Sequence, residues 1–401
     1  MKKLFFYLSC VLSTIFIGCF PSKKATNTSS EVSLNWVDQN LQSSAQQYKV
    51  LMKQVHEGMM PETFVDGKLK TCEPSNWIAG FYPGNLIFLF EDTGDSSFYK
   101  EALHKITLME REQYNKGTHD LGFMMYCSYG NLNKISPEEK YKEILLNSAR
   151  SLSTRFNPKV GCIRSWGNSN NTTEFKVIID NMMNLELLMW AAKETGDTNF
   201  SHIAITHANT TMENHFRPDN SSYHVVIYNP KTGEVIKKVT AQGAANSSAW
   251  ARGQSWGLYG YTMMYRETKD KKYLEQAHKI AEFILNNPHL PADKIPYWDY
   301  DAPGIPNAKR DASSAAIMAS ALIELSKYSN ASLSKKYLNT ASVILHSLSS
   351  PQYRAAYGKE GGFLLKHSVG NMNANADVDV PLPYADYYYL EALMRYKSIL
   401  Q

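Results

Sequence analysis

The sequence lacks the short motifs that mark nucleotide-binding and metal-dependent enzymes. It has no P-loop, no GxGxxG segment after a strand and no HExxH pair. Its five cysteines form no CxxC or Cys/His spacing suited to zinc. We therefore expect neither a bound metal nor a cofactor.

The chain also has no strong net charge of either sign. The 42 Lys and Arg residues nearly balance the 38 Asp and Glu residues, so the net charge is only +4 over 401 residues. No polybasic stretch is present, which argues against a nucleic-acid partner and leaves an acidic small substrate permitted. Aromatic residues make up 12% of the chain, and part of this supply is suited to stacking against sugars.

The longest apolar run lies at the N-terminus and is too short to cross a bilayer comfortably. It extends from Leu4 to Ile17 after a basic start, as in a secretory signal peptide. Ile17-Gly18-Cys19 resembles a bacterial lipobox, in which Cys19 is acylated, and ordinary secretion is the alternative. We expect a signal peptide over 1–18, a polar tether over 19–32 and a single domain over 33–401. This organisation predicts a monomer in the bacterial periplasm or at the outer membrane, bound to the membrane only through its lipid.

The remaining cysteines are few. Cys10 belongs to the predicted signal peptide, which leaves Cys72, Cys127 and Cys162 in the folded domain. One disulfide is possible among these three, but ordinary buried thiols are the favoured interpretation.

Helical hairpins repeat along the chain. A similar phrase, with a helix end, a Gly- or Asp-bearing turn and a new amphipathic start, occurs as LFEDTGDSSFYKEAL (89–103), AKETGDTNFSHIA (192–204) and YRETKDKKYLEQA (265–277). The most apolar helices are expected to start near Trp77, Asp120, Asp180, Trp256, Asp311 and Asp386. An amphipathic helix precedes each of them, beginning near Leu34, Ser97, Pro137, Thr198, Lys271 and Ser334.

Six such pairs predict a closed double ring. Nearly all-apolar helices belong inside and one-sided helices outside, so we predict an all-α fold, an (α/α)6 barrel. The inner helices would then all start at one mouth of the barrel. The six residues named for the starts of the most apolar helices, Trp77 to Asp386, would meet there. An αα-solenoid is the alternative, and it would spread the same residues along a concave face.

One segment departs from the helical pattern. Between Ser222 and Gly243, two β-branched runs flank NPKTG, which predicts a small inserted β-hairpin. This hairpin would carry His224 and Gln242 to the mouth over which it folds.

Two aspartates stand at the starts of successive apolar helices. Asp120 lies in THDLGFMMYCSYG and Asp180 in VIIDNMMNLELLMW. Each is suited to capping its helix, because Asp accepts hydrogen bonds from the free N–H groups at a helix start. In a barrel they would also be neighbours, and paired carboxylates with different pKa values are typical of acid/base work on glycosides. From the pattern alone, both interpretations stay open.

Other candidates surround this pair. The stretch NSSAWARGQSWGLYGYT brings Arg252, which suits a carboxylate ligand, and Trp256, which suits a sugar ring. Trp77 and Trp166 lie where loops meet helices. The loop IPYWDYDAP is interpreted either as a substrate contact or as a segment pinned against the barrel. Asp311 is expected to act as a cap or a salt-bridge partner.

Six segments together resemble a known family. HDLGF, IIDNMMNLELL, WARGQSWGLYGY, PYWDYDAP, RDASSAA and DYYYLEAL are similar, in this order, to the unsaturated glucuronyl hydrolases of glycoside hydrolase family 88, over residues 33–399. The resemblance implies an (α/α)6 barrel that acts without metal or cofactor. Its substrate would be the Δ4,5-unsaturated uronic acid that lyases leave at the non-reducing end of oligosaccharides, glycosaminoglycan fragments among them.

The resemblance also implies roles for individual residues. Asp180 would be the catalytic acid/base and Asp120 its partner carboxylate. The implied substrate-binding residues are Trp77, His119, Trp166, His224, Gln242, Arg252 and Trp256. Such a substrate needs a proton donor, because protonation of its enol ether starts the hydration of the double bond. Burial beside Ile178, Ile179 and Met183, with anionic Asp120 nearby, would raise the pKa of Asp180 toward neutrality.

Two other functions compete with this one. An unsaturated rhamnogalacturonyl hydrolase would share the barrel and the hydration chemistry but act on pectin fragments. A surface glycan-binding lipoprotein would use the aromatic residues without catalysis. The two carboxylates favour an enzyme, because binding alone does not require them.

Overall fold

The computed structural model describes residues 1–3, 32–168 and 170–401. The predicted signal peptide beyond its first three residues, Cys19 and all of the tether except Val32 lie outside these ranges. Residues Glu31–Gln401 form one compact unit. Within the described ranges, every helix is too short or too polar to qualify as a membrane span.

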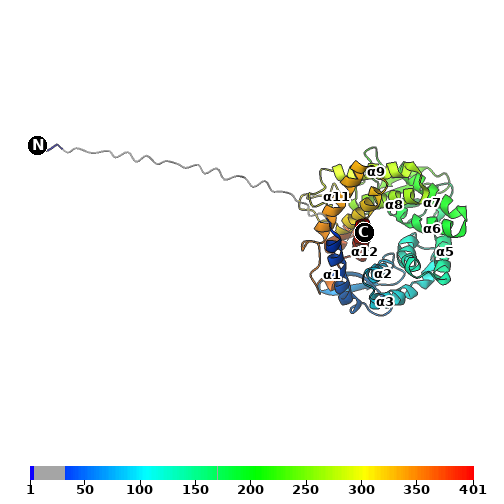
Figure 1. The fold of residues 1–401 in the computed structure, drawn as a ribbon. Helices are drawn as coiled ribbons and strands as arrows, with labels where there is room; N and C mark the ends of the chain where they lie inside the picture. Colours follow the sequence, from blue (N-terminus) through cyan, green and yellow to red (C-terminus); the bar gives the residue numbers. More distant parts are fainter. Residues whose placement is uncertain (4–31, 169) are drawn as a thin grey trace. The chain divides into compact units, whose positions relative to one another are not determined.

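In the described part of the chain, twelve α-helices, two of them extended by other helical turns, form two concentric rings (Figure 1). The outer ring contains α1 (Leu34–Met52), α3 (Ser96–Leu108), α5 (Glu139–Ser153), α7 (Thr198–Asn214), α9 (Lys271–Asn286) and α11 (Ala331–Leu348). The inner ring contains α2 (Phe81–Thr93), the π-helix η2 (Gly122–Gly130) with α4 (Asn131–Ile135), the 3-10 helix η3 (Ile179–Asn184) with α6 (Leu185–Thr195), α8 (Ala251–Thr268), α10 (Ala312–Ser326) and α12 (Pro383–Leu400). The last inner helix, α12, packs against α2 and α1, so the ring is closed. The predicted (α/α)6 barrel is confirmed, and the open solenoid is not.

Burial explains which helices lie inside. Every residue of α10 is buried, whereas α9 buries a single stripe that repeats at helical spacing. The recurring phrase of the sequence marks the turns between the rings. Asp95, Asp197 and Asp270 are the N-caps of α3, α7 and α9, and each accepts a hydrogen bond from the backbone N–H two residues later.

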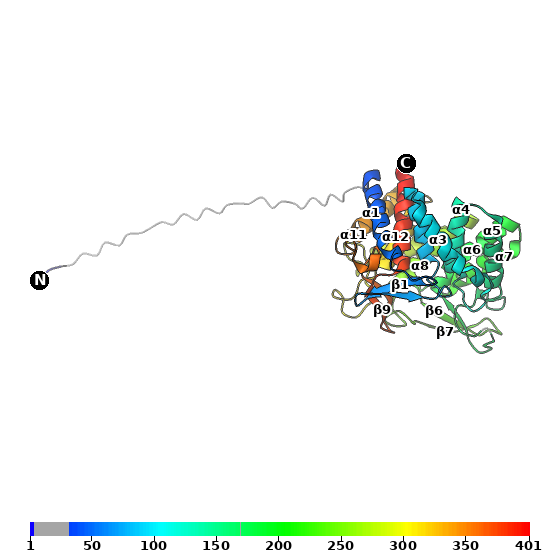
Figure 2. The ribbon, with the colours of Figure 1, turned by 90° about the horizontal axis from the view of Figure 1, so that it is seen from below.

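Among the described residues, four small antiparallel sheets accompany the helices. They comprise β1 (Met60–Val65) with β2 (Lys68–Cys72), β3 (Phe156–Asn157) with β4 (Cys162–Ile163), β5 (Phe175–Ile178) with β6 (Val225–Tyr228) and β7 (Val235–Val239), and β8 (Ser368–Asn371) with β9 (Ala376–Val380). Two short 3-10 turns, η1 (Glu110–Tyr114) and η4 (Glu360–Gly362), complete the elements. Figure 2 shows β1, β6, β7 and β9 gathered at one end of the helical ring, opposite the C-terminal end of α12.

The predicted β-hairpin is present, and the structure adds a third strand to it that was not predicted. Strands β6 and β7 pair as expected, and β5 adds a third strand, with Ile178 opposite Val225. Strand β5 ends two residues before Asp180, and its last two residues, Val177 and Ile178, belong to the stretch that the sequence predicts as an apolar helix. Their β-branched side chains instead favour an extended strand once a partner strand is available.

One predicted helix start needs correction. Trp256 is the sixth residue of α8 and does not stand at a helix start, whereas Asp386 lies in the first turn of α12, near the start as predicted. Both side chains are fully buried and do not face the mouth. Cys72, Cys127 and Cys162 are free thiols, in agreement with the favoured interpretation.

Candidate active site

A cavity of about 210 Å³ opens at the strand-bearing end of the barrel. It is smaller than the roughly 300–1,000 Å³ typical of pockets that enclose a drug-sized ligand, which suits a ligand that inserts only its end. Seven of the nine residues predicted for the site line it, namely Trp77, His119, Asp120, Trp166, Asp180, Gln242 and Arg252. His224 and Trp256 do not line the cavity, although both lie against Asp180.

Asn184 joins the two segments that carry the aspartates. Its Oδ1 accepts a hydrogen bond from the backbone N–H of Phe123 at 3.0 Å, and its Nδ2 donates to Asp120 Oδ1 at 3.4 Å. Gly122 makes this approach possible, because a Cβ atom there would lie only 2.4 Å from the Cα atom of Asn184. The motifs HDLGF and IIDNMMN therefore fit together as one unit.

Asp120 is fixed by polar neighbours. Besides the Asn184 amide, Thr118 Oγ1 donates to its Oδ2 at 3.4 Å, and His119 Nε2 lies 3.3 Å from its Oδ1. Thr118 Oγ1 also accepts from the Asp120 backbone N–H at 3.0 Å. The carboxylate is thus held in one orientation at the wall of the cavity, with 15% of its side chain exposed.

Asp180 has a contrasting environment. It is the second residue of η3, just after β5, and its buried Oδ2 has no hydrogen-bond partner within the described part of the chain. Burial raises the pKa of Asp180 to about 7, Arg252 opposes this rise, and Asp120 adds to it. The direction and both expected causes agree with the sequence-based prediction. Asp180 is therefore able to hold a proton near neutral pH.

The capping interpretation of Asp180 does not describe this structure. The N-cap of α6 is Asn184, and the first turn of η3, which contains Asp180, has no side-chain cap. A carboxylate that is not engaged in capping keeps its proton-transfer capacity for a ligand.

His224 lies behind Asp180 with a defined tautomer. Its Nδ1 accepts hydrogen bonds from the backbone N–H groups of Ala241 and Gln242, both at 3.1 Å. The neutral ring must then carry its proton on Nε2, which lies 3.7 Å from Asp180 Oδ2. Burial lowers the pKa of His224 to about 3, so the ring stays neutral. His224 thus presents an N–H group to Asp180 and is not itself positioned as a base.

The guanidinium of Arg252 is already occupied by protein acceptors. It donates to Asp311 Oδ2 at 3.2 Å, to Gln242 Oε1 at 2.9 Å and to the backbone carbonyls of Val369 and Gly370. The two terminal NH2 groups of Arg252 are therefore not both free to donate to a substrate carboxylate, as the predicted bidentate contact requires. Because Gln242 uses its oxygen on Arg252, its amide N–H groups are the ones presented to a ligand.

Trp256 lies behind the wall of the cavity and contacts residues that line it. Its ring packs against Phe123 and Tyr388, with centroids 5.1 Å and 5.3 Å away, and its side chain is fully buried. A hydrogen bond from Trp256 to Asp180 slightly opposes the rise in the Asp180 pKa. The predicted stacking of Trp256 on a sugar ring is therefore not available in this structure.

The remaining polar candidates have structural roles. Asp311 caps α10 by accepting from Ser313 N at 3.1 Å and pairs with Arg252, as expected. Asp386 accepts from the backbone N–H groups of Leu364 and Leu365 and from Tyr48. In the loop IPYWDYDAP, Asp299 accepts from Ala244 N and Ser248 Oγ, which shows that the loop is pinned to the barrel.

The segment Gly253 to Gly257 also matches the GxSxG pattern. The nucleophile of that pattern sits on a strained strand-to-helix turn. Ser255 instead lies within α8, is fully buried and bonds to the carbonyl and hydroxyl of Ser314. It is not a nucleophile.

Several cavity residues were not among those predicted from the sequence. They are Glu62, Asn76, Ile78, Phe123, Ile178, Gly370, Asn371, Ala376, Asp377, Leu382 and Tyr384. Phe123 and Ile178 belong to the two aspartate motifs and Tyr384 adjoins DYYYLEAL, so those motifs were available as signals. Glu62 and Asp377 come from β1 and β9, two short strands with no periodic pattern long enough to recognise.

Comparison with known proteins gives consistent matches. The family model of Glycosyl Hydrolase Family 88 matches residues 45–392. An unsaturated glucuronyl hydrolase of Formosa agariphila is 46% identical over 326 residues, which cover 81% of each chain. An unsaturated chondroitin disaccharide hydrolase of Streptococcus pneumoniae is 34% identical over 84% of this chain and 85% of its own. The crystal structure of an unsaturated glucuronyl hydrolase specific for heparin superposes with a TM-score of 0.88 at 48% identity, covering 91% of this chain and 98% of that one.

The family match spans most of the described domain, and both of these curated relatives exceed 30% identity over more than four-fifths of the chain. The predicted resemblance is confirmed, and a non-catalytic glycan-binding protein is excluded. The chain belongs to Glycosyl Hydrolase Family 88 and is a glycoside hydrolase of the unsaturated glucuronyl hydrolase type.

Proposed function

We propose that the enzyme removes the Δ4,5-unsaturated uronic acid from the non-reducing end of lyase-generated oligosaccharides. The observation that carries this proposal is the protonated state available to Asp180, beside Asp120 in one small cavity. An enol ether needs an acid that still holds its proton near neutral pH, and burial provides one here.

The reaction begins with proton transfer from Asp180 to C4 of the unsaturated ring. The positive charge that develops at C5 and the ring oxygen is stabilised by the nearby carboxylate of Asp120. Water adds at C5 and gives up a proton to Asp180, which restores the starting acid. The resulting hemiketal opens, C1 becomes a hemiacetal, and its collapse releases the neighbouring sugar.

The surrounding residues position the ring for this transfer. Trp77 and Trp166 line the cavity and offer aromatic faces to it. The amide N–H groups of Gln242 are suited to the substrate carboxylate, a role that Arg252 fills only indirectly by orienting Gln242. The Nε2–H of His224 stabilises the Asp180 carboxylate after the proton has left.

Glycosaminoglycan fragments are the proposed substrate class. The relatives are described as acting on unsaturated chondroitin disaccharides or as specific for heparin. The names of these relatives favour a glucuronyl substrate over a rhamnogalacturonyl one.

The test mixes purified protein with lyase-generated disaccharides from chondroitin, hyaluronan, heparin and pectin. Loss of absorbance of the conjugated double bond reports hydration. We expect activity on glycosaminoglycan disaccharides and little on the pectin fragment. Absence of any loss with all four substrates would contradict the proposal.

We also propose that Cys19 carries a lipid and that this lipid anchors a monomeric enzyme in the bacterial periplasm or at the outer membrane. The supporting evidence is the N-terminal sequence alone, with its basic start, apolar run and Ile17-Gly18-Cys19. Expression of Cys19→Ser should move the enzyme from the membrane to the soluble fraction. Cys10→Ser, a change within the same leader, should leave it in the membrane fraction, and light scattering of the domain should give the monomer mass.

A further inference from the structure

Two carboxylates outside the catalytic pair also face the cavity. Glu62 lies on β1 and Asp377 on β9, and these strands contact each other. Both residues are half-buried. In the described part of the chain, neither carboxylate makes a hydrogen bond or an ion pair with another side chain. Both are therefore available to a ligand in the cavity.

The two pairs of carboxylates occupy different parts of the cavity. Asp120 and Arg252 influence the pKa of Asp180, whereas Asp377 and Lys70 influence that of Glu62. The turn Asn373–Ala376, which leads into Asp377, is exposed to solvent. Glu62 and Asp377 thus belong to the outer part of the cavity. Their strands, β1 and β9, lie at the strand-bearing end of the barrel (Figure 2).

This placement matters because the substrate enters with its end first. The unsaturated ring must reach Asp180, so the sugar that is released remains toward the outer part of the cavity. It then lies next to Glu62 and Asp377. This step rests on the proposed function, which requires the terminal ring to be the one that Asp180 protonates.

The outer part of the cavity has little positive charge to balance these groups. Lys70 on β2 is the cation that lowers the pKa of both carboxyl groups, and its side chain is exposed. Arg252 is committed to Asp311, Gln242 and backbone carbonyls. Burial raises the pKa of both Glu62 and Asp377, as expected for carboxylates with reduced access to water.

We propose that Glu62 and Asp377 select for a neighbouring sugar that carries no anionic group. A sulfate ester on that sugar would be repelled by two nearby carboxylates. Hydroxyl groups of an unsulfated sugar are instead able to donate hydrogen bonds to them. The pair therefore acts as a specificity filter and not as part of proton transfer.

The experiment compares two disaccharides that differ only in one sulfate on the neighbouring sugar. For each enzyme, the measured quantity is the ratio of kcat/KM for the sulfated substrate to that for the unsulfated one. We expect a ratio well below one for the native enzyme. Glu62→Gln and Asp377→Asn should each raise the ratio about fivefold, and the double variant should raise it further.

Asp66→Asn is the matched control. Asp66 lies between β1 and β2 with φ 53°, is exposed and does not line the cavity. Asn tolerates this left-handed conformation, so the variant removes one charge from the same hairpin without strain. Its ratio should equal that of the native enzyme.

Ionic strength provides a second readout that a merely structural role would not change. Added salt should raise the ratio in the native enzyme, because it screens the repulsion, and should have little effect in the double variant. If the double variant hydrolyses the unsulfated substrate but its ratio of kcat/KM values equals that of the native enzyme, the proposed selectivity is wrong. The proposed function would then stay intact. Failure of the native enzyme on both disaccharides would overturn both.

Discussion

Asp180 and Asp386 show how similar carboxyl groups obtain different roles. Burial raises the pKa of each to about 7. Asp386 accepts hydrogen bonds from Leu364, Leu365 and Tyr48 and so fastens a loop to α12. Asp180 keeps a buried oxygen without a partner and lines the cavity. The sequence placed both at starts of apolar helices, and only the hydrogen bonds distinguish the structural group from the chemical one.

The activity should depend on the proton of Asp180. Because the acid is active when protonated, kcat should fall about tenfold per pH unit once the pH exceeds about 7. Asp180→Asn should lower kcat at least about a thousandfold, since an amide cannot donate the proton that C4 needs. Steady-state rates from pH 5 to 9 on one disaccharide check both expectations. A native rate that stays constant from pH 6 to 9, or a fully active Asn variant, would contradict this assignment.

At the scale of elements, amphipathic patterns predicted the helices well and the short strands poorly. The predicted outer starts at Leu34, Thr198 and Lys271 coincide with those observed. Strand β5 was missed because Val177 and Ile178 continue directly into an apolar helical stretch, so that no change of period marks the boundary. Its partner β6 lies more than forty residues later, and such distant pairing leaves no local signal.

The close contact of η2 and η3 makes Gly122 a sensitive position. Gly122→Ala would place a methyl group against the backbone of Asn184, so the two aspartate segments must move apart. We expect a loss of about 1–3 kcal/mol in unfolding free energy together with a clear fall in kcat. Gly257→Ala on α8 is the control, because the nearest atom to its new Cβ lies at 3.4 Å. Equal stability and activity for both variants would show that the close contact is unimportant.

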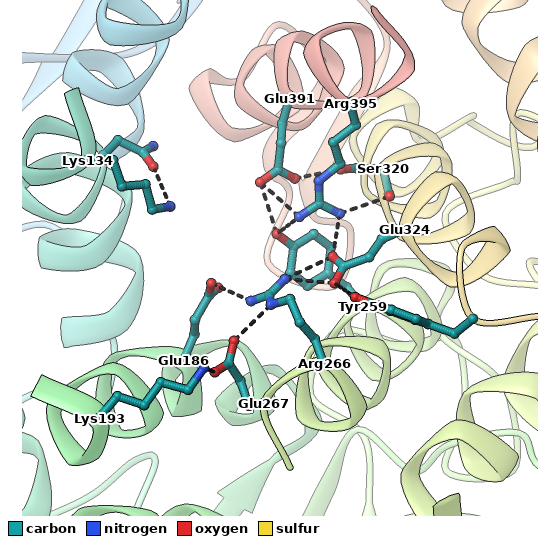
Figure 3. Close-up of polar contacts among 12 residues, drawn as sticks. Lys134, Glu186, Lys193, Tyr259, Arg266, Glu267, Ser320, Glu324, Glu391 and Arg395 are labelled. Atoms are coloured by element: carbon teal, nitrogen blue, oxygen red, sulfur yellow. Dashed lines mark hydrogen bonds and ion pairs between the residues drawn. The ribbon is translucent and has the colours of Figure 1, made fainter. Parts of the chain in front are cut away.

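At the scale of the whole molecule, the two ends of the barrel are chemically distinct. The end away from the strands contains an ionic network that links α6, α8, α10 and α12 (Figure 3). Arg266 pairs with Glu186, Glu267 and Glu324, and Arg395 pairs with Glu324 and Glu391. This network could not be predicted from the sequence, because its members are isolated charges on largely apolar helices.

Glu324 contacts both arginines and is 8% exposed, so its loss should be costly. Glu324→Gln should reduce the unfolding free energy by about 3 kcal/mol, because two cations lose a shared buried partner. Lys193→Gln removes an exposed member of the same network and should cost under about 1 kcal/mol. Urea unfolding measures both. Since the cavity lies at the other end, kcat/KM of folded Glu324→Gln should stay within about twofold of the native value, and a large drop would indicate coupling between the ends.

The burial of Asp180, with one oxygen unpartnered, also limits the free energy of unfolding at neutral and higher pH. Its pKa is about 7 in the folded chain and about 3.9 when unfolded, so the folded state binds the proton more tightly. The contribution of Asp180 to the unfolding free energy is fully present below about pH 4 and is lost as the pH rises to about 7. The loss amounts to at most about 4 kcal/mol. Asp180→Asn should therefore melt higher than the native enzyme at pH 8 and show little gain at pH 4. The native barrel exchanges some of its heat resistance for the ability to turn over substrate.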